Sequence, residues 1–221
     1  MTRFDAVLFD MDGVLLEGAS TPASVYRRAA GDTIEALELA VPDDQRAPLE
    51  QYHFDQEMAA CCRGLGVDPA AFWQTREHFA TERATHRLAT SEREPFADTA
   101  ALADLSVPLG IVSNNRAATV DFVAERLFSG RFDIAIGRDP TVTGFERRKP
   151  DSHYLDRALD SLGTDRAVYV GDRETDVLAA RAAGIESAFL RRAHNDGVTF
   201  DQPPALDIES LRALPSMLEV P

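Results

Sequence analysis

Short runs of consecutive apolar residues recur along the chain, without the alternation of a half-exposed strand. Such runs are typical of strands buried on both faces of a parallel sheet. They occupy residues 6–9, 109–112, 132–136, 167–170 and 188–190. Helical periodicity separates them at residues 99–105, 117–128, 152–162 and 174–183. The alternation predicts an α/β fold with a doubly wound, Rossmann-like parallel sheet, which a strand and a helix in the tail would complete.

One stretch after the first apolar run breaks this alternation. Residues 18–94 show helical periodicity and no strand pattern. Apolar side chains recur at helical spacing from Val25 to Leu37, and again from Phe72 to Leu88. We therefore expect a Rossmann-like core domain formed by residues 1–17 and 95–221, and an inserted all-helical domain formed by residues 18–94.

The net charge limits the classes of molecule that the protein is expected to bind. Acidic residues outnumber basic residues 37 to 23, and the net charge is −14. Such a surface repels nucleic acids and anionic membranes. The chain has no apolar run of transmembrane length, and aspartates at positions 5 and 10 are unlike a signal peptide. We expect a cytoplasmic protein with no nucleic-acid or membrane partner, and the sequence does not indicate the oligomeric state.

Lysine is almost absent from the chain. Of the 23 basic residues, Lys149 alone is a lysine. An acid excess with so little lysine suggests a halophilic host, in which a dense carboxylate surface keeps proteins soluble. The alternative is an acidic protein from a GC-rich genome that prefers arginine. Either way, the single lysine indicates a position that the planar fork of arginine does not fit.

Two carboxylates follow the first apolar run. Asp10 and Asp12 stand two residues apart, just before Gly13, where the strand would open into a loop. One carboxylate there can act as a nucleophile or a metal ligand, and the second can act as a general acid and base. The pattern is weak alone, because turns are rich in aspartate and glycine.

Two further apolar runs end in polar groups. Ser113 and Asn114 follow the second run, where a hydroxyl and amides at a helix N-terminus suit an anion or simply cap the helix. Asp172 follows the fourth run, and Asp176 lies one helical turn later, although acids also commonly begin a helix. Because the carboxyl ends of parallel strands meet at one edge of the sheet, we expect these groups to converge.

Convergence would place four carboxylates in one cleft, those of Asp10, Asp12, Asp172 and Asp176. They could not all stay ionised without cations, so we expect Mg²⁺ there. Lys149 would supply a second positive charge. Its compact ammonium can sit between a nucleophilic carboxylate and an incoming phosphate.

The same residues carry a family resemblance. The segments VLFDMDGVL, IVSNN, RRKP and VYVGDRETD resemble, in order and spacing, the four motifs of the haloacid dehalogenase-like hydrolase superfamily. The similarity covers essentially the whole chain. The helical insert resembles the cap of the branch that contains phosphoglycolate phosphatases and β-phosphoglucomutases.

The resemblance implies a phosphatase that acts through an aspartyl-phosphate. Asp10 would attack the phosphorus, and Asp12 would protonate the leaving oxygen and then activate the hydrolytic water. Ser113 and the backbone N–H of Asn114 would hold phosphate oxygens. Lys149 would neutralise charge on Asp10 and on the phosphoryl group.

The resemblance also implies Mg²⁺ as the cofactor. The ion would be held by the carboxylates of Asp10 and Asp172 and by the carbonyl of Asp12. Asp176 would complete or orient the coordination sphere. The metal and Lys149 would together stabilise the charge that develops on the phosphoryl oxygens.

Other activities of the superfamily fit less well. A dehalogenase does not need the acid at Asp12, and the phosphonatase of the family uses a cap lysine, which residues 18–94 lack. A phosphomutase of the β-phosphoglucomutase type stays open, although mutases often have an acidic dipeptide where this chain has Gly171-Asp172. A non-catalytic binding protein on the same scaffold also stays open.

The implied cap favours a small phosphorylated metabolite as the substrate, such as a sugar phosphate or phosphoglycolate. A cap closing over the site would exclude bulk water and select the leaving group. Candidate cap contacts are Arg27, His53, Arg63 and Arg76. Each of these is more typical of a solvated helix residue than of a ligand contact.

Overall fold

The computed structural model describes residues 3–18 and 20–218 of the chain. Contacts between Cα atoms divide the chain into two compact units. Unit 1 consists of Met1–Ser20, Arg93–Arg138 and Arg147–Pro221. Unit 2 consists of Thr21–Glu92 and Asp139–Glu146.

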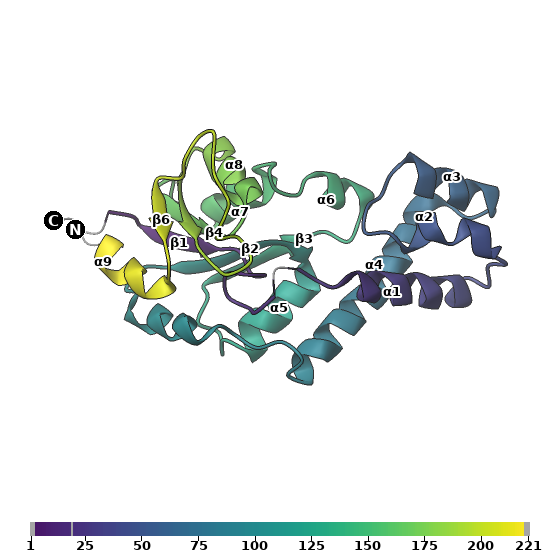
Figure 1. Ribbon diagram of the computed structural model, residues 1–221, viewed down its shortest axis with the longest axis horizontal. Coiled ribbons are helices and arrows are strands. Elements are labelled where there is room, and N and C mark those ends of the chain that lie inside the picture. The colour runs from purple at the N-terminus through teal and green to yellow at the C-terminus, as the bar shows by residue number, and fades with distance from the viewer. Residues whose placement is uncertain (1–2, 19, 219–221) are drawn as a thin grey trace. The chain divides into compact units, whose positions relative to one another are not determined.

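A six-stranded parallel sheet forms the centre of the described part of unit 1 (Figure 1). Its strands are β1 (Ala6–Phe9), β2 (Leu109–Arg116), β3 (Ile134–Arg138), β4 (Ala167–Gly171), β5 (Glu186–Leu190) and β6 (Leu206–Ile208). They lie in the order β3-β2-β1-β4-β5-β6. Every residue of β1 and β4 is buried, as the unbroken apolar runs predict. The predicted α/β fold with a doubly wound parallel sheet is therefore confirmed.

Helices cover both faces of this sheet. Helix α5 (Ala117–Arg126) lies on one face, and α7 (His153–Leu162) and α8 (Glu174–Ala182) lie on the other (Figure 1). The tail ends in β6, a 3₁₀ turn η3 (Leu211–Ala213) and a short helix α9 (Leu214–Leu218), as expected.

The segment before β2 differs in helix type from the sequence prediction. It forms a 3₁₀ helix, η2 (Ala97–Asp104), instead of an α-helix. The backbone N–H and the hydroxyl of Thr99 both donate to the carbonyl of Phe96, three residues back, which is the 3₁₀ pattern.

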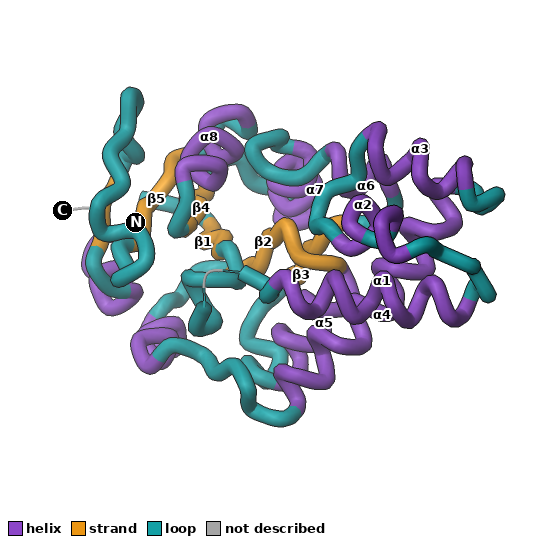
Figure 2. Tube along the Cα trace, turned by 45° about the vertical axis from the view of Figure 1, so that its right-hand side comes forward, coloured by secondary structure: helices purple, strands orange, loops and turns teal. Residues whose placement is uncertain are grey.

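The described residues of unit 2 are helices joined by loops, without a strand (Figure 2). The elements are α1 (Ala23–Ala36), η1 (Asp43–Gln45), α2 (Ala47–Glu50), α3 (Gln56–Gly64), α4 (Pro69–Ala89) and α6 (Val142–Glu146). Helices α1 and α4 lie side by side, and Arg83 donates to both carboxylate oxygens of Asp32 across them. No helix in the described part of the chain is long and apolar enough to cross a membrane.

An aromatic cluster explains why residues 139–146 group with unit 2, although the sequence prediction places them in the core domain. The ring of Phe145 on α6 lies 4.9 Å from that of Trp73 on α4 and 5.3 Å from that of Tyr52. The rings of Trp73 and Phe145 belong to one buried cluster with Ile34 and Met58, and Tyr52 packs against it. The grouping depends on packing between segments far apart in sequence.

The candidate cap contacts have different environments. Arg27, His53 and Arg63 are exposed, as expected of solvated helix residues. Arg76 is completely buried, so the expectation of a solvated side chain is wrong there. Its guanidinium lies over the Trp73 ring and donates to backbone carbonyl groups that follow α2. Arg76 is therefore part of the interior of unit 2.

Candidate active site

The three central strands of unit 1 end at one edge of the sheet. Asp10 follows β1, Ser113 lies near the end of β2, and Asp172 follows β4. The Asp10 N–H donates to the carbonyl of Val170 at 2.9 Å, which extends the pairing of β1 with β4. The strand order β2-β1-β4 thus brings together the three motifs that the sequence places at strand ends.

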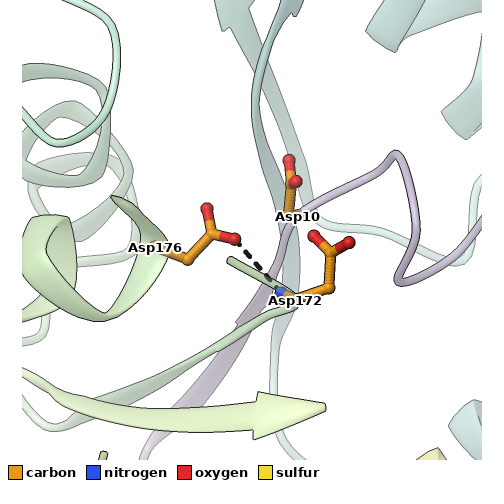
Figure 3. Close-up of side chains that lie close together, drawn as sticks. All are labelled: Asp10, Asp172 and Asp176. Carbon is orange, nitrogen blue, oxygen red and sulfur yellow. Dashed lines mark hydrogen bonds between the residues drawn. The ribbon is translucent and has the colours of Figure 1, made fainter. Parts of the chain in front are cut away.

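Three buried carboxylates meet at this edge (Figure 3). Asp10, Asp172 and Asp176 each offer one oxygen, and these oxygens lie within 4.8 Å of one another. Asp176 Oδ2 accepts hydrogen bonds from the N–H groups of Asp172 at 3.1 Å and Arg173 at 3.0 Å. These bonds fix the Asp176 side chain at the start of α8 and turn its other oxygen toward the cluster.

Two glycines permit this close packing. A Cβ on Gly171 would lie 2.2 Å from the Asp176 Cβ, and a Cβ on Gly13 would lie 2.2 Å from Asp172 Oδ2. Gly13 also has a φ of +84°, which side chains disfavour. Any larger residue at either position would displace a carboxylate of the cluster.

Lys149 is the buried counter-ion of the cluster. Its Nζ lies 2.9 Å from Asp10 Oδ1 and 2.7 Å from Asp176 Oδ1. It also donates to the Tyr169 hydroxyl at 2.5 Å, which in turn donates to the carbonyl of Val112 at 2.7 Å. Burial alone would lower the pKa of Lys149, but the charges of Asp10 and Asp176 outweigh it and raise that pKa above its ordinary value. The ammonium therefore stays protonated between two carboxylates.

Negative charge exceeds positive charge in the cluster. Burial, followed by the charges of Asp10 and Asp176, raises the pKa of the Asp172 carboxyl to about 8. Burial also raises the pKa of Asp176, despite the opposing charge of Lys149. Asp172 Oδ1 is buried and has no hydrogen-bond partner among the described residues. Carboxylate oxygens are the ligands that Mg²⁺ prefers, so the three carboxylates fit a divalent cation of this kind.

The carboxylate of Asp12 does not join this cluster, contrary to the expected convergence of all four. Its Oδ1 accepts from Arg93 Nη1 at 2.7 Å, and its Oδ2 accepts from Asn115 Nδ2 at 3.1 Å. These two donors hold the side chain away from the three buried carboxylates. Asn115 lies in the segment IVSNN, which is expected to meet the Asp10 segment, although its contact with Asp12 is not predicted. Nothing in the sequence links Arg93 to Asp12, which lies 81 positions earlier.

The remaining predicted residues lie beside the cluster. Ser113 is buried, and its Oγ accepts from the N–H of Asn115 at 3.3 Å. Asn114 Oδ1 accepts from the backbone N–H of Lys149 at 2.8 Å, and its Nδ2 donates to the Lys149 carbonyl at 3.3 Å. The side chain of Asn114 thus fixes the backbone of Lys149.

The loop after β5 supplies two residues that sequence analysis missed. His194 Nε2 lies 2.5 Å from Asp172 Oδ2, and Asn195 Nδ2 donates to the Asp172 carbonyl at 2.8 Å. Burial and the charges of Arg173 and Arg192 lower the pKa of His194, so its neutral ring can donate to Asp172. The only available signal was that a histidine and an asparagine follow a buried strand whose end lies at the same edge.

Comparisons with known proteins agree with this geometry. The model of the haloacid dehalogenase-like hydrolase family matches residues 4–184. The chain is 28% identical over 227 residues to a phosphoglycolate phosphatase from Pseudomonas fluorescens, covering 96% of this chain and 79% of that protein. It is also 28% identical over 196 residues to an N-acetylmuramic acid 6-phosphate phosphatase from Pseudomonas aeruginosa, covering 86% and 82%.

The fold has similar solved structures. The crystal structure of CbbY from Rhodobacter sphaeroides in complex with phosphate superimposes with a TM-score of 0.66 at 22% identity, and the match covers 96% of each chain. This similarity concerns the fold. Because the family model spans most of the sequence and the buried cluster forms at the matching strand ends, the chain belongs to the haloacid dehalogenase-like hydrolase family.

Proposed function

We propose that the chain is a Mg²⁺-dependent phosphatase that hydrolyses a small phosphorylated metabolite through an aspartyl-phosphate on Asp10. One observation carries this proposal: a buried carboxylate cluster contains a lysine between Asp10 and Asp176 and one carboxylate oxygen without a partner. A purely structural cluster would balance its charges. This one lacks positive charge, which a bound cation would supply before a phosphate group could enter.

In the first step, an Asp10 oxygen attacks the phosphorus and the bond to the ester oxygen breaks. Lys149 lies 2.9 Å from Asp10 Oδ1, so its charge acts on the nucleophile and on the arriving phosphoryl oxygens. Asp12 gives its proton to the leaving oxygen, which departs as an alcohol. The Ser113 hydroxyl and the Asn114 N–H orient the phosphoryl group.

In the second step, the Asp12 carboxylate takes a proton from water while the water oxygen attacks the phosphorus. The bond between phosphorus and Asp10 then breaks, and inorganic phosphate leaves. Asp12 returns to its protonated form, and Asp10 returns to its carboxylate. The carboxylates of Asp10 and Asp172 and the Asp12 carbonyl would hold Mg²⁺, with Asp176 orienting the site. The bound metal would supply charge stabilisation for the phosphoryl oxygens.

Phosphoglycolate and sugar phosphates are the substrates that we expect. The two phosphatase relatives are named for phosphoglycolate and for N-acetylmuramic acid 6-phosphate, both small phosphate esters. We propose that residues 18–94 act as a cap that selects among such esters. A cytoplasmic location and a surface adapted to concentrated salt fit the net charge of −14 and the single lysine.

The test is phosphate release from p-nitrophenyl phosphate, phosphoglycolate and a panel of sugar phosphates, in molar KCl, with Mg²⁺ or with EDTA. We expect Mg²⁺-dependent release that is lost in Asp10→Asn, and a panel ranking that identifies the substrate class. Release that persists in Asp10→Asn, or that does not respond to EDTA, would contradict the proposal. Repeating the assay in dilute buffer tests the salt adaptation, which predicts loss of folded protein there.

A phosphomutase of the β-phosphoglucomutase type remains the second candidate. It would share the cluster and pass the phosphoryl group of Asp10 to a sugar instead of to water. A folded protein that binds Mg²⁺, fails to release phosphate, and converts a sugar 1-phosphate would favour it. Folded protein that binds phosphate esters without converting any would indicate the non-catalytic binding protein.

A further inference from the structure

Arg93 contacts the acid–base carboxylate and the chain segment that leads to unit 2. Its Nη1 donates to Asp12 Oδ1 at 2.7 Å, its Nε donates to the Glu17 carbonyl at 2.9 Å, and its Nη2 donates to the Gly18 carbonyl at 2.8 Å. The Arg93 and Asp12 side chains are only 11% and 15% exposed. Each nitrogen of the guanidinium therefore has a different partner in a mostly buried setting.

Arg93 stands at a junction of the two units. The chain leaves unit 1 after Ser20 and returns at Arg93 itself. Within unit 1, the outgoing and returning segments pair: the Glu17 N–H donates to the Glu94 carbonyl at 2.9 Å, and the Phe96 N–H donates to the Leu15 carbonyl at 3.0 Å. We call residues 15–18 together with 93–96 the linker pair. Arg93 adds two side-chain bonds to this backbone pairing.

The Asp12 carboxylate has little freedom to turn. Arg93 holds one of its oxygens, and Asn115 Nδ2 holds the other at 3.1 Å. A proton donor must point at the leaving oxygen within hydrogen-bond reach, so the orientation of this carboxylate limits the rate. Of the two residues that donate to Asp12, Arg93 and Asn115, only Arg93 also belongs to the linker pair.

We propose that Arg93 is a positioning residue that couples the orientation of Asp12 to the linker pair. A shift of the Glu17 and Gly18 carbonyls would move the guanidinium and, through it, the carboxylate. Arginine suits this role because its rigid fork can span three acceptors, which a lysine ammonium at the end of a flexible chain cannot do in the same geometry. The inference rests on the proposed function, in which Asp12 moves the proton.

Leaving-group chemistry separates this role from general damage to the fold. p-Nitrophenolate departs as a weak base and needs no proton from Asp12, whereas an alkoxide does. The value of kcat/KM covers the steps up to phosphoryl transfer to Asp10, so it includes the acid step and excludes the later hydrolysis of the aspartyl-phosphate. The two substrates are p-nitrophenyl phosphate and the alkyl phosphomonoester that the wild type hydrolyses fastest.

We expect Arg93→Gln to lower kcat/KM for the alkyl ester by about tenfold to a hundredfold, and for p-nitrophenyl phosphate by less than about threefold. Asp12→Asn should show the same asymmetry more strongly. Adding Arg93→Gln to Asp12→Asn should change the ratio of kcat/KM between the two substrates little, because both substitutions remove the same function, proton donation by Asp12. Arg93→Lys should behave like Arg93→Gln, since charge alone does not hold the carboxylate.

A second readout comes from the hydrolysis step, in which Asp12 acts as the base. With p-nitrophenyl phosphate, Arg93→Gln should give a burst of p-nitrophenol followed by a slow steady state, because the aspartyl-phosphate then accumulates. The control is Arg87→Gln, which removes a partly buried arginine that pairs with Glu92 far from Asp12 in the sequence. It should keep the wild-type ratio of kcat/KM between the two substrates. Thermal unfolding of each variant verifies that it is folded.

Three results would overturn the inference. The first is an equal loss of kcat/KM for both substrates in Arg93→Gln, and the second is a fully active Arg93→Lys. The third is a further change in the ratio of kcat/KM between the two substrates when Arg93→Gln is added to Asp12→Asn. If the wild type is active and Asp10→Asn is not, such results remove the role of Arg93 alone. If the folded wild type cleaves no ester, the proposed function fails, and the role of Arg93 fails with it.

Discussion

Among the charged side chains that are buried in the described residues, two groups, one in each unit, differ in their balance of positive and negative charge. In unit 2, Arg76 and Glu77 are both fully buried and lie 3.4 Å apart, and Arg76 also donates to nearby backbone carbonyls. In unit 1, three carboxylates lie together with one ammonium, that of Lys149, which contacts two of them.

This difference separates a structural pair from a functional cluster. One positive and one negative group can neutralise each other, and backbone carbonyls accept further hydrogen bonds from the two Nη atoms of Arg76. Three carboxylates with one lysine cannot do so. Burial, together with the charges of Asp10 and Asp176, raises the pKa of Asp172 to about 8. Burial of charge is common to both sites, so it is the charge imbalance in unit 1 that supports the proposed cation site.

Substitution of Lys149 should have the largest effect. Lys149→Met removes the only positive side chain that contacts Asp10 in the described residues, and we expect kcat/KM to fall about 10³-fold or more. Lys149→Arg should also lose at least about 10²-fold, because a planar fork does not fit among Asp10, Asp176 and Tyr169. Arg166→Lys, at an exposed arginine, is the matched control and should remain active. Wild-type rates in Lys149→Arg would contradict the account.

Substitution of Arg76 should affect stability instead of catalysis. Arg76→Met removes a buried positive charge beside Glu77, and we expect the free energy of unfolding to fall by about 3 kcal/mol. Urea unfolding measures this loss, and Arg76→Met/Glu77→Gln should recover part of it. The folded variant should keep its kcat/KM for p-nitrophenyl phosphate. A loss of catalysis without a loss of stability would show that Arg76 serves the substrate after all.

The pH dependence of the metal response tests the imbalance itself. Without metal, Asp172 keeps its proton up to a pKa of about 8, against an ordinary value of 3.8, so the metal-free protein should lose stability as the pH rises through this range. Mg²⁺ must displace that proton, so it should bind more tightly at about pH 8.5 than at about pH 6. At a concentration of about 100 Kd, the ion should add about 2.7 kcal/mol.

Unfolding curves with Mg²⁺ and with EDTA at both pH values make this measurement. Asp172→Asn is the control, since it removes both the titrating group and a proposed metal ligand. Equal stabilisation by Mg²⁺ at the two pH values would count against Asp172 as a ligand that carries a raised pKa.

Removal of the Tyr169 hydroxyl should have the smallest effect. The Tyr169 hydroxyl accepts from Lys149 and donates to the Val112 carbonyl, so Tyr169→Phe removes one hydrogen-bond partner from each of these two groups. The direct 3.5 Å contact between Lys149 Nζ and the Val112 carbonyl then remains. We expect a loss of about 1–2 kcal/mol in stability and about tenfold in kcat/KM. Tyr154→Phe, at a tyrosine buried in the same hydrophobic cluster, should change kcat/KM little. Equal effects of the two substitutions would remove any special role of Tyr169.

Local sequence patterns predicted the fold well where the burial of an element follows from its own residues. The unbroken run from Ala6 to Phe9 had to be buried on both faces, and it forms the central strand β1. The side chains of Val25, Ala29 and Ile34 recur at helical spacing, and they are the buried face of α1. Residues 139–146 could not be grouped in this way, because Phe145 finds its partners some seventy positions earlier in the sequence.

The site was predictable where a motif ends a strand. Asp10, Ser113 and Asp172 meet because their strands are neighbours. The supporting residues could not be found, because their roles depend on spatial neighbours alone. In the sequence, Tyr169 is indistinguishable from the other residues of an apolar strand, and His194 is indistinguishable from an ordinary loop residue.

The most direct test of the central claim is to locate the phosphoryl group on the enzyme. Asp12→Asn should accept it from p-nitrophenyl phosphate but hydrolyse it slowly, so acid-quenched samples suit mass spectrometry. The account predicts one phosphoryl group per chain, on Asp10, that forms with Mg²⁺, diminishes with EDTA, and is absent from Asp12→Asn/Asp10→Asn. A phosphoryl group on another residue would contradict the account. So would phosphate release by the wild type without any phosphorylated form of the enzyme.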